Sequence, residues 1–454
     1  MNRIIRGPVS LRGEIFVPGD KSISHRSIML GAIAEGVTQI DGFLMAEDCL
    51  STINCFKKMG IEIHISRNPS PPAGNMSRPC KTAKYGKSLS NTSGIKVTVF
   101  GRGLRGLKKP DAPLYVGNSG TTIRLLSGIL AGQNFEAEIT GDESIQKRPM
   151  GRVTEPLRLM GAKIQGADGG NRAPLKIHGA QLKAIRYKLP VASAQVKSAI
   201  LLAGLYASGE TVIEEPQKSR DHTEIMLKAF GADIVWHDNV IRLNPVEKLT
   251  PRQISVPGDI SSAAFFIAGA CILPGSDVLI KNVGINPTRS GIIEALRRMG
   301  ADIQVTGMFE RNGEPVADIH VKSGGLSGIT VEGEIIPRLI DEIPVLAVAA
   351  AFAEGVTVIK DAQELRVKES NRIAAMVEGL SRLGARIKET RDGMEIFGPC
   401  RLRGNRVRSF GDHRVAMALA VAGAGAEGET CIEDAGCVNI SYPGFFDTLE
   451  NLSR

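Results

Sequence analysis

One structural unit recurs six times along the 454 residues of this chain, and no other sequence feature constrains the fold as strongly. Each copy has a polar or glycine-rich start, a segment rich in Ala, Ile and Leu, a glycine and a run of β-branched residues, which is typical of a helix followed by a strand. A second helix follows, and in five copies it ends in a phrase such as RLMGAKI or RRMGADI, whose glycine suits a helix C-cap. The six copies begin at Asp20, Asn118, Ser193, Asp259, Asp341 and Asp412.

The first helix of each unit is apolar almost all round, so it must be buried on every side. We therefore predict an α/β fold with helices inside and sheets outside, in which three units close into one domain and six form two similar domains. A Pro-bearing stretch at 245–257 separates the third and fourth units, and an N-terminal strand within 4–17 is expected to pair with the second domain. The predicted domains are 20–256 and 1–19 plus 257–454, with the active site in the cleft between them.

Residues 67–94 interrupt the first unit between two strands. They are rich in Pro, Ser, Asn and Lys and lack the apolar residues that would offset the entropy of ordering. We expect a disordered surface insertion.

The composition narrows the class of function. The net charge is +8 without a long basic run, and aromatic residues make up only 4%, which favours acidic small molecules over nucleic acid as partners. The seven cysteines form no CxxC or Cys/His cluster, so neither a disulfide framework nor a metal site is indicated. No apolar run approaches the roughly 20 residues of a membrane span. We expect a cytoplasmic protein that acts as a monomer on small molecules.

The polar starts of the first three units carry cations and hydroxyls. The run GDKSISHR (19–26) opens onto an apolar helix, whose free N–H groups favour a phosphate or carboxylate beside Lys21 and Arg26. GNSGTT (117–122), SAQ (193–195) and SRDH (219–222) recur at similar places. Each alone is also compatible with a capped helix start, a tight turn or a solvated loop. Their repetition in several units favours one shared anion site.

In the second half the starts become acidic, at Asp341 and again around Lys368 and Glu369. A lysine among other cations has a lowered pKa, which suits acid–base chemistry. The alternative is a salt-bridged helix start. His413 is interpreted as a hydrogen-bonding cap rather than a metal ligand, because no second His or Cys lies at metal spacing.

The chain resembles the 5-enolpyruvylshikimate-3-phosphate synthases, the sixth enzymes of the shikimate pathway that leads to chorismate and the aromatic amino acids. The resemblance covers nearly the whole chain. It is carried by PGDKSISHR (18–26), GNSGTTIRLL (117–126), KRPMGRV (147–153), SAQVKSA (193–199), RDHTE (220–224), IDEIPVLAVAAAFAEG (340–355), ELRVKESNRI (364–373) and GDHRVAMAL (411–419). It implies two inside-out α/β barrel domains, each of three βαβαββ repeats, and no cofactor or metal.

The resemblance also implies the reaction and the site. The family transfers the enolpyruvyl group of phosphoenolpyruvate to the 5-hydroxyl of shikimate 3-phosphate and releases phosphate. The residues implied at shikimate 3-phosphate are Lys21, Ser22, Arg26, Ser193, Ala194, Gln195, Arg220, Asp341 and Lys368. Those implied at phosphoenolpyruvate are Lys21, Asn118, Gly120, Arg148, Gln195, Arg372 and Arg414. The implied catalytic residues are Asp341 as the base at the 5-hydroxyl, Lys368 on the same hydroxyl, Glu369 in protonating the methylene, and Lys21.

Several features refine this prediction. SAQVKSA and RDHTE resemble the second bacterial class of the family more than the first. In this family the herbicide glyphosate competes with phosphoenolpyruvate at the position that Gly120 matches. Glycine is expected to leave open space beside the backbone there, which implies a glyphosate-sensitive enzyme, although tolerant members of the second class carry alanine. Because several cations converge, we also expect the cleft to stay open until an acidic ligand binds.

The chain departs from the family's pattern at two places, and two other functions are compatible with its general character. Asn371 stands where Asp is usual, and 439–441 lacks the family's later cation. One alternative is the enolpyruvyl transferase that acts on UDP-N-acetylglucosamine, but Cys80 lacks the context of its catalytic cysteine. Another is a non-enzymatic phospholigand- or RNA-binding module, which would gain nothing from the carboxylates Asp341 and Glu369 facing its ligand.

Overall fold

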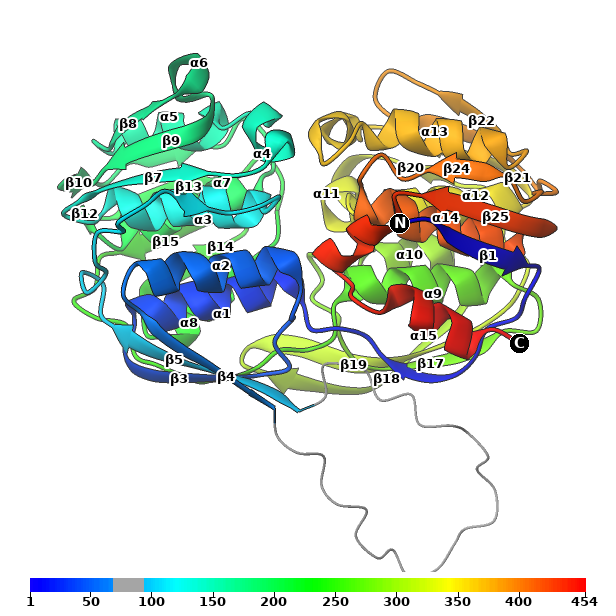
Figure 1. Ribbon diagram of the computed structural model, residues 1–454, viewed down its shortest axis with the longest axis horizontal. Helices are drawn as coiled ribbons and strands as arrows, with labels where there is room; N and C mark the ends of the chain where they lie inside the picture. The colour runs from blue at the N-terminus through cyan, green and yellow to red at the C-terminus, as the bar shows by residue number, and fades with distance from the viewer. Residues whose placement is uncertain (68–93) are drawn as a thin grey trace, which may run out of the picture.

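The computed structural model describes residues 1–67 and 94–454, and the chain in it forms two lobes that lie side by side (Figure 1). The predicted insertion at 67–94 falls, apart from its two end residues, outside the described part. Within that part, no helix has the length and apolar character needed to cross a membrane.

The first lobe contains three copies of the repeat. The first comprises α1 (Lys21–Ile33), β3 (Glu35–Asp41), α2 (Glu47–Lys58), β4 (Glu62–Arg67), β5 (Ile95–Arg102) and the later strand β16 (Gln253–Ser255). The second comprises β6 (Leu114–Tyr115), α3 (Gly120–Ala131), β7 (Glu136–Thr140), α4 (Glu143–Lys147), α5 (Gly151–Leu159), β8 (Lys163–Gly166), α6 (Ala167–Gly170) and β9 (Arg172–His178). The third comprises β10 (Leu182–Lys183), β11 (Arg186–Lys188), α7 (Ala194–Gly204), β12 (Ala207–Ser208), β13 (Thr211–Glu214), α8 (His222–Ala229), β14 (Asp233–His237) and β15 (Val240–Asn244).

The second lobe repeats this arrangement. Its first unit comprises β2 (Arg12–Phe16), α9 (Ile260–Ile272), β17 (Asp277–Gly284), α10 (Gly291–Arg298), β18 (Asp302–Arg311) and β19 (Glu314–Lys322). The next comprises β20 (Thr330–Val331), η1 (Gly333–Ile335), α11 (Ile336–Leu339), α12 (Ile343–Phe352), β21 (Gly355–Ile359), η2 (Gln363–Val367), α13 (Arg372–Arg382), β22 (Arg386–Glu389) and β23 (Met394–Gly398). The last comprises β1 (Arg3–Gly7), β24 (Arg406–Arg408), α14 (His413–Gly425), β25 (Gly428–Glu433), η3 (Ala435–Ile440) and α15 (Phe445–Leu452).

The sheets of five of the six units share one topology. A short strand lies parallel to the strand that follows the first helix, and that strand pairs antiparallel with a hairpin, as in the orders β16-β3-β5-β4, β6-β7-β9-β8 and β20-β21-β23-β22. The last unit lacks its own hairpin, and β1 pairs antiparallel with β25 in its place. Segments from the beginning of the chain therefore complete sheets at its end.

The two lobes exchange short strands where the chain crosses between them. The N-terminal segment forms two strands rather than one, and both join the second lobe, β1 beside β25 and β2 beside β17. In return β16 pairs with β3 of the first lobe. The two crossings, at Pro18–Asp20 and Pro257–Asp259, bind each other through Asp20 N–H to the Pro257 carbonyl (2.8 Å) and Asp259 N–H to the Pro18 carbonyl (2.9 Å). On these pairings we propose the domain division 20–256 and 1–19 plus 257–454.

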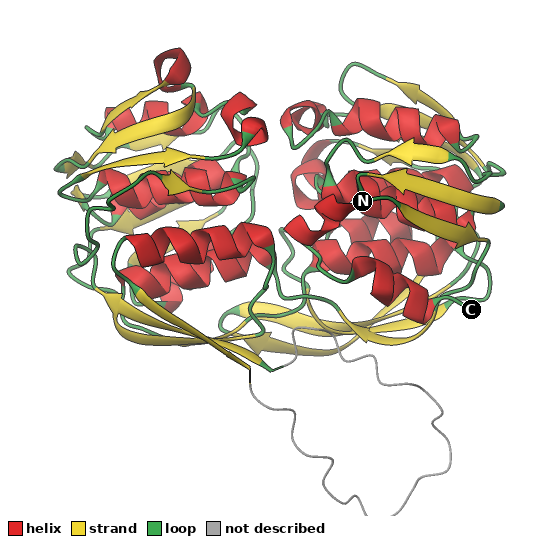
Figure 2. Cartoon of the chain, viewed as in Figure 1, coloured by secondary structure: helices red, strands yellow, loops and turns green. Residues whose placement is uncertain are grey.

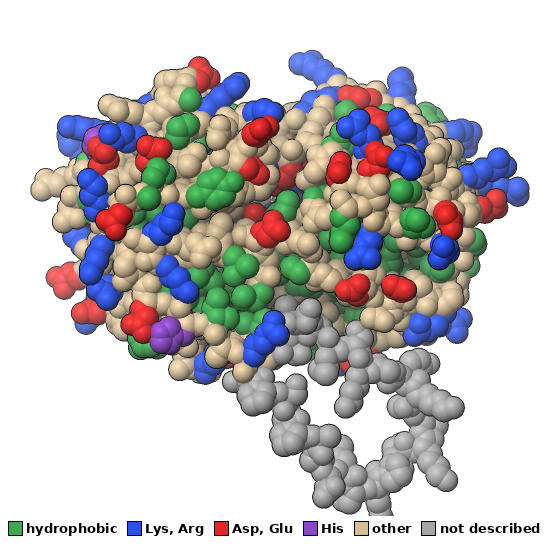
Figure 3. Space-filling model, viewed as in Figure 1, with side chains coloured by type: hydrophobic (Ala, Val, Ile, Leu, Met, Phe, Trp, Pro, Cys, Tyr) green, Lys and Arg blue, Asp and Glu red, His purple; other side chains and the backbone are tan. Residues whose placement is uncertain are grey.

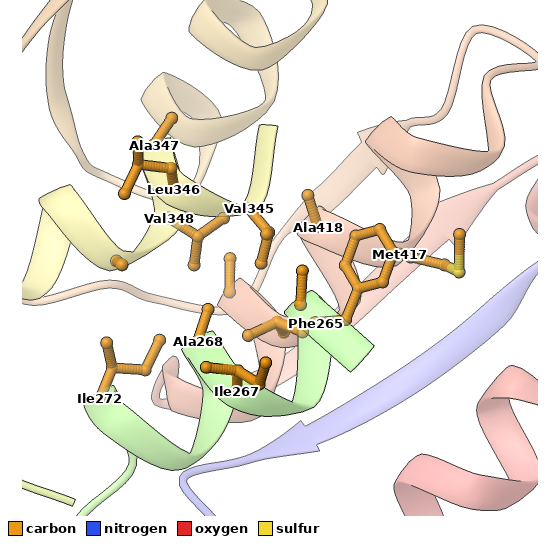
Figure 4. Packing of buried hydrophobic residues seen from close by; sticks show 14 of the residues in the cluster. Phe265, Ile267, Ala268, Ile272, Val345, Leu346, Ala347, Val348, Met417 and Ala418 are labelled. Atoms are coloured by element: carbon orange, nitrogen blue, oxygen red, sulfur yellow. The ribbon is translucent and has the colours of Figure 1, made fainter. Parts of the chain in front are cut away.

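The first helices of the units form the core of each lobe, and the strands lie outside them (Figure 2). Every residue of α9 is buried, as is almost every residue of α12 and α14, and the three helices pack on one another (Figure 4). In the first lobe α1, α3 and α7 occupy the same place. Because these helices point the same way in their units, their N-terminal ends meet at the interface between the lobes.

Candidate active site

A cavity of about 530 Å³ lies between the lobes, and the polar starts of the units line it. Of the residues implied by the family resemblance, Asn118 alone does not line this cavity. Those that do are Lys21, Ser22, Arg26, Gly120, Arg148, Ser193, Ala194, Gln195, Arg220, Asp341, Lys368, Glu369, Arg372 and Arg414. The fold therefore gathers side chains that lie up to about 390 positions apart in the sequence into one cavity.

The start of α1 supplies two cations to the first-lobe wall. Asp20 caps the helix by accepting a hydrogen bond from the N–H of Ile23 at 2.8 Å, which leaves Lys21 at the first helical position. The Lys21 ammonium pairs with Asp48 of α2 at 3.0 Å. Arg26, one turn further, is buried, and burial lowers the pKa of its guanidinium to about 10. Both cations are thus held in fixed positions at the floor of the cavity.

Arg26 is oriented by hydroxyl groups of the third unit. Its Nε donates to Thr223 Oγ1 at 2.6 Å, and its Nη2 donates to Ser198 Oγ at 2.9 Å. These partners carry no charge, so the guanidinium keeps its positive charge available for an anionic ligand.

The second unit contributes Arg148 and its support. Asn118 accepts a hydrogen bond from Arg148 Nη2 at 2.6 Å and donates one to Asp142 at 2.8 Å. Asn118 therefore orients Arg148, and its implied contact with phosphoenolpyruvate stays a prediction.

The space beside Gly120 is not open, contrary to expectation. A Cβ atom at this position would lie 2.7 Å from Nη1 of Arg124 and 3.1 Å from Nη1 of Arg148. The reason is that Arg124, one turn along α3, extends back toward the helix start to donate to Gln195 Oε1 at 2.7 Å. Alanine here would first displace the ends of two arginine side chains.

Asp341 is the centre of charge on the second-lobe wall. Its oxygens lie 2.5 Å from Arg220, 3.0 Å from Arg372, 3.8 Å from Lys368 and 3.9 Å from Arg414. Burial alone would raise the pKa of Asp341, but the surrounding cations, Arg220 most strongly, outweigh burial and hold this pKa well below its usual value. One carboxylate therefore faces four cations that come from both lobes.

Lys368 and Glu369 flank Asp341. Burial is the main cause that lowers the pKa of Lys368, and the neighbouring arginines add to it, so the converging cations predicted from the sequence are the lesser cause. Burial would raise the pKa of Glu369, but the charges of Arg372 at 2.7 Å and Arg148 at 3.5 Å hold it well below its usual value. The site thus combines a lysine that releases its proton more readily with two ionised carboxylates, the elements of acid–base catalysis.

The lobes are joined by ion pairs across the cavity, whereas repulsion among the cations was expected to keep the cleft open. Arg220 binds Asp341, Arg148 approaches Glu369, and Arg152 binds Glu364 at 2.9 Å. The prediction counted the cations and neglected the carboxylates that neutralise them. On the face that Figure 3 shows, acidic side chains also lie along the seam between the lobes.

His413 does not cap its helix, so that interpretation was wrong. Asp412 is the cap: its Oδ1 accepts from the N–H of Arg414 at 2.9 Å, and its Oδ2 binds Arg372 at 2.8 Å. Neither ring nitrogen of His413 has a hydrogen-bond partner within the described residues, and the ring lines the cavity. Burial, with the charge of Lys21, holds the pKa of His413 well below its usual value, so the imidazole is neutral.

No group of three or more His, Cys, Asp or Glu side chains in the described residues could hold a metal ion. Cys80, which was weighed as a catalytic cysteine, lies outside those residues.

Comparison with known proteins identifies the family. The family model for EPSP synthase (3-phosphoshikimate 1-carboxyvinyltransferase) matches residues 5–71 and 80–449. The chain belongs to the EPSP synthase family. It is 54% identical over 444 residues to the 3-phosphoshikimate 1-carboxyvinyltransferase of Bacillus cereus (strain B4264), which covers 98% of this chain and 97% of the relative. It is also 54% identical over 442 residues to that of Thermoanaerobacter sp. (strain X514), with 97% and 98% covered.

Solved structures agree with the predicted fold. The EPSP synthase from Acinetobacter baumannii superposes with a TM-score of 0.83 at 46% identity and covers 100% of this chain and 98% of that one. The enolpyruvyl transferase NikO from Streptomyces tendae has a TM-score of 0.77 at 18% identity, covering 99% and 97%, which shows a shared fold alone. The predicted two-domain enolpyruvyl transferase fold is confirmed.

The departures from the EPSP synthase pattern have simple structural accounts. Asn371 caps α13, accepting a hydrogen bond from the N–H of Ala374 at 3.2 Å, which is a role that Asn and Asp share. None of the residues 439–441 is among those that line the cavity.

Seven charged residues that line this cavity were absent from the sequence-predicted site: Asp48, Arg124, Arg152, Asp259, Arg289, Asp361 and Glu364. Arg124 stood within the motif GNSGTTIRLL, so its motif already pointed to it. Arg289 is buried and reaches both lobes, binding Asp20 at 3.4 Å and Asp259 at 3.1 Å. No sequence motif pointed to Asp48 or Arg289, because their place in the site depends on partners that only the fold brings close to them.

Proposed function

We propose that the cavity of this 3-phosphoshikimate 1-carboxyvinyltransferase binds shikimate 3-phosphate and phosphoenolpyruvate side by side and uses Asp341, Lys368 and Glu369 to move protons between them. The observation that carries the proposal is the position of Asp341, one carboxylate held among four cations from both lobes and next to a lysine with a lowered pKa. A pure anion-binding site would have no use for a carboxylate at its centre.

Shikimate 3-phosphate is placed on the first-lobe wall and against Asp341. Arg26 of α1 and Arg220 of the loop before α8 both line the cavity, and each guanidinium can donate two hydrogen bonds to one phosphate. Ser193 caps α7 toward the cavity, which adds a helix N-terminus to these cations. The proposed contacts are Lys21, Ser22, Arg26, Ser193, Ala194, Gln195, Arg220, Asp341 and Lys368.

Phosphoenolpyruvate is placed between the second unit and the second lobe, where Arg148, Arg372 and Arg414 face one another. It carries a phosphate and a carboxylate, so it offers a partner to every one of these cations. The proposed contacts are Lys21, Asn118, Gly120, Arg148, Gln195, Arg372 and Arg414, and Asn118 also accepts a hydrogen bond from Arg148.

The proposed chemistry assigns one proton transfer to each carboxylate. Asp341, assisted by Lys368, accepts the proton of the 5-hydroxyl of shikimate 3-phosphate. The oxygen of this hydroxyl forms a bond to C2 of phosphoenolpyruvate at the same time. Glu369 delivers a proton to C3, which becomes a methyl group. The C2–O bond to phosphate then breaks and C3 loses a proton, which restores the double bond of the enolpyruvyl product.

Substrate binding prepares both carboxylates for these roles. In this structure the pKa of Asp341 and that of Glu369 are held down by arginines. An anionic ligand that forms ion pairs with Arg220, Arg148 and Arg372 draws them away from the two carboxylates. The ionised carboxylates are then less stabilised, so both pKa values rise. Asp341 becomes a stronger base, and Glu369 becomes able to carry a proton.

We propose that a monomer is the active form, because both walls of the cavity belong to the same chain. We propose that this monomer works in the cytoplasm, where its two phosphorylated substrates would be found.

Release of inorganic phosphate tests the proposed function. Purified protein is mixed with phosphoenolpyruvate and either shikimate 3-phosphate or UDP-N-acetylglucosamine, and phosphate is followed with a coupled assay. We expect phosphate release only in the mixture that contains shikimate 3-phosphate. Release with UDP-N-acetylglucosamine would indicate the related transferase, and binding of phosphoenolpyruvate without release from either mixture would indicate a binding module.

A further inference from the structure

The second lobe holds the first through the tip of the β18–β19 hairpin, which lies outside the cavity. Figure 1 shows this hairpin running along the lower side of the molecule toward the other lobe. Asn312 and Gly313 form its two-residue turn with φ values of 51° and 83°, the conformation that favours an Asn-Gly pair. The Asn312 amide accepts from Ser255 N–H at 3.0 Å and donates to the Gln253 carbonyl at 2.9 Å. The tip is therefore fastened to β16, a strand of the first lobe.

Glu314, the first residue of β19, extends this contact into a buried cluster. Its Oε1 accepts a hydrogen bond from Nδ1 of His222 at 2.6 Å, at the start of α8 in the first lobe. Its Oε2 accepts from Nδ2 of Asn286 at 2.9 Å, and the same nitrogen donates to Asp221 at 2.9 Å. All four residues are less than 8% exposed. Because buried carboxylates are stable only when their oxygens are bound, this cluster fixes α8 relative to the hairpin.

The start of α8 adjoins one cation proposed for shikimate 3-phosphate, Arg220, and contacts another, Arg26 of α1. Arg220 directly precedes Asp221 and reaches Asp341 at 2.5 Å. Thr223 accepts from Nε of Arg26 at 2.6 Å, so it sets the direction of that guanidinium. A shift of the N-terminus of α8 would therefore move Arg220 and remove one of the hydrogen bonds that orient Arg26.

The arginines proposed to bind phosphoenolpyruvate are held in place by other residues. Arg148 is held by Asn118, and Arg372 is held by Asp412. Neither of these contacts involves α8 or the hairpin. The cluster around Glu314 thus supports one half of the cavity and not the other.

We propose that Glu314 is a positioning residue for shikimate 3-phosphate, because it holds the N-terminus of α8, and with it Arg220 and Arg26, in register with the second lobe. Glu314 does not touch the substrate. This inference rests on the proposed function.

The test compares the KM values of the two substrates in the full-length protein. Glu314→Gln keeps the side-chain size but removes the charge and one acceptor, so either His222 or Asn286 loses its partner. We expect the KM for shikimate 3-phosphate to rise about tenfold, since small misplacements of binding groups have effects of this order or larger. The KM for phosphoenolpyruvate is expected to stay within about twofold.

A second variant reaches the same contact from the backbone. Gly313→Ala places a Cβ 2.8 Å from Cγ2 of Ile225 in α8 and requires alanine at φ +83°, so it lifts the tip from the first lobe. We expect the same selective rise in KM. Glu310→Gln, an exposed glutamate on the same hairpin, is the matched control and should leave both KM values unchanged.

The outcomes are distinct. A selective rise for shikimate 3-phosphate in both variants, with rates still measurable at saturation, supports the proposal. Unchanged KM values, an equal rise for both substrates, or a loss of folded enzyme with normal KM values would each overturn it, because a merely structural role predicts one of those results. A wild-type protein that releases no phosphate from shikimate 3-phosphate and phosphoenolpyruvate would reject the proposed function itself.

Discussion

Replacing Asp341 with asparagine should separate binding from catalysis, because this carboxylate competes with the substrate for the same cation. Arg220 lies 2.5 Å from Asp341, and both side chains are less than a fifth exposed. A phosphate that binds Arg220 must draw it from that ion pair. Asp341→Asn removes the competing charge and also removes the proposed base.

The expected magnitudes follow from the geometry. A hydrogen bond to a charged group contributes about 1.5–3 kcal/mol, and solvent screening reduces the value for this partly exposed pair, so release of Arg220 is worth about 1–1.5 kcal/mol. Shikimate 3-phosphate should therefore bind as tightly as to the wild type or up to about tenfold more tightly. Loss of the base should lower turnover by about 10²–10⁴-fold.

The two quantities are measured separately. Titration calorimetry gives the dissociation constant of shikimate 3-phosphate, and phosphate release at saturating substrate gives kcat. Glu364→Gln is the matched control, because it removes the ion pair with Arg152 across the lobes without changing any proposed substrate contact. Near wild-type turnover in Asp341→Asn, or binding weakened by more than about tenfold, would refute the reasoning.

The low pKa of Asp341 also predicts how the stability difference between wild type and Asp341→Asn depends on pH. The folded-state pKa of Asp341 lies well below its usual value, so its ion pairs stabilise the fold above the unfolded-state pKa near 4 and stop doing so as the pH falls through the lower, folded value. The stability difference between wild type and Asp341→Asn should therefore be constant from about pH 5 to 8 and shrink in acid. Urea unfolding at several pH values measures it, and a difference that changes between pH 6 and 8 would contradict the assignment.

Three further predictions concern other parts of the site. Glu369→Gln should lower turnover by about 10²–10⁴-fold and prevent uptake of solvent deuterium at C3, measured by mass spectrometry; normal uptake would assign the proton to another group. Gly120→Ala should weaken glyphosate inhibition by about tenfold or more, with a smaller rise in the phosphoenolpyruvate KM, because the methyl displaces Arg124 and Arg148; superimposable inhibition curves would show that Gly120 does not line the inhibitor site. Replacing 68–93 with a short turn should leave activity and melting temperature nearly unchanged, because Arg67 and Ile95 already pair across β4 and β5; a folded but inactive variant would show that the segment takes part in function.

The repeat was sufficient to predict the architecture because its physical requirements are local. A helix that is apolar all round, such as α12, can only be central, and a glycine in the left-handed conformation, such as Gly161 or Gly300, marks where a helix ends before a strand. The short edge strand β16 has only three residues and no pattern of its own. Its place beside β3 follows from how the crossings pair, which the sequence does not show.

The candidate site was predictable where function and motif coincide, and less so where a residue acts through a partner. Lys21, Arg220 and Asp341 line the cavity from three different units. Asn118 was predicted to contact phosphoenolpyruvate, but the sequence did not indicate that it accepts a hydrogen bond from Arg148. His413 and Asp412 are adjacent, and a sequence cannot say which of two neighbouring side chains turns toward the helix start.

The balance of charge in the cavity connects binding with catalysis. Cations that bind two phosphorylated substrates would repel one another unless carboxylates lay among them, and Asp341 and Glu369 meet this need. The same arginines that bind these carboxylates lower their pKa values, so neither is ready for proton transfer in this arrangement. When the substrate anions bind these arginines, the two carboxylates become more basic. The reacting hydroxyl and the methylene carbon then lie beside them. The groups that neutralise the site are therefore the ones that binding activates.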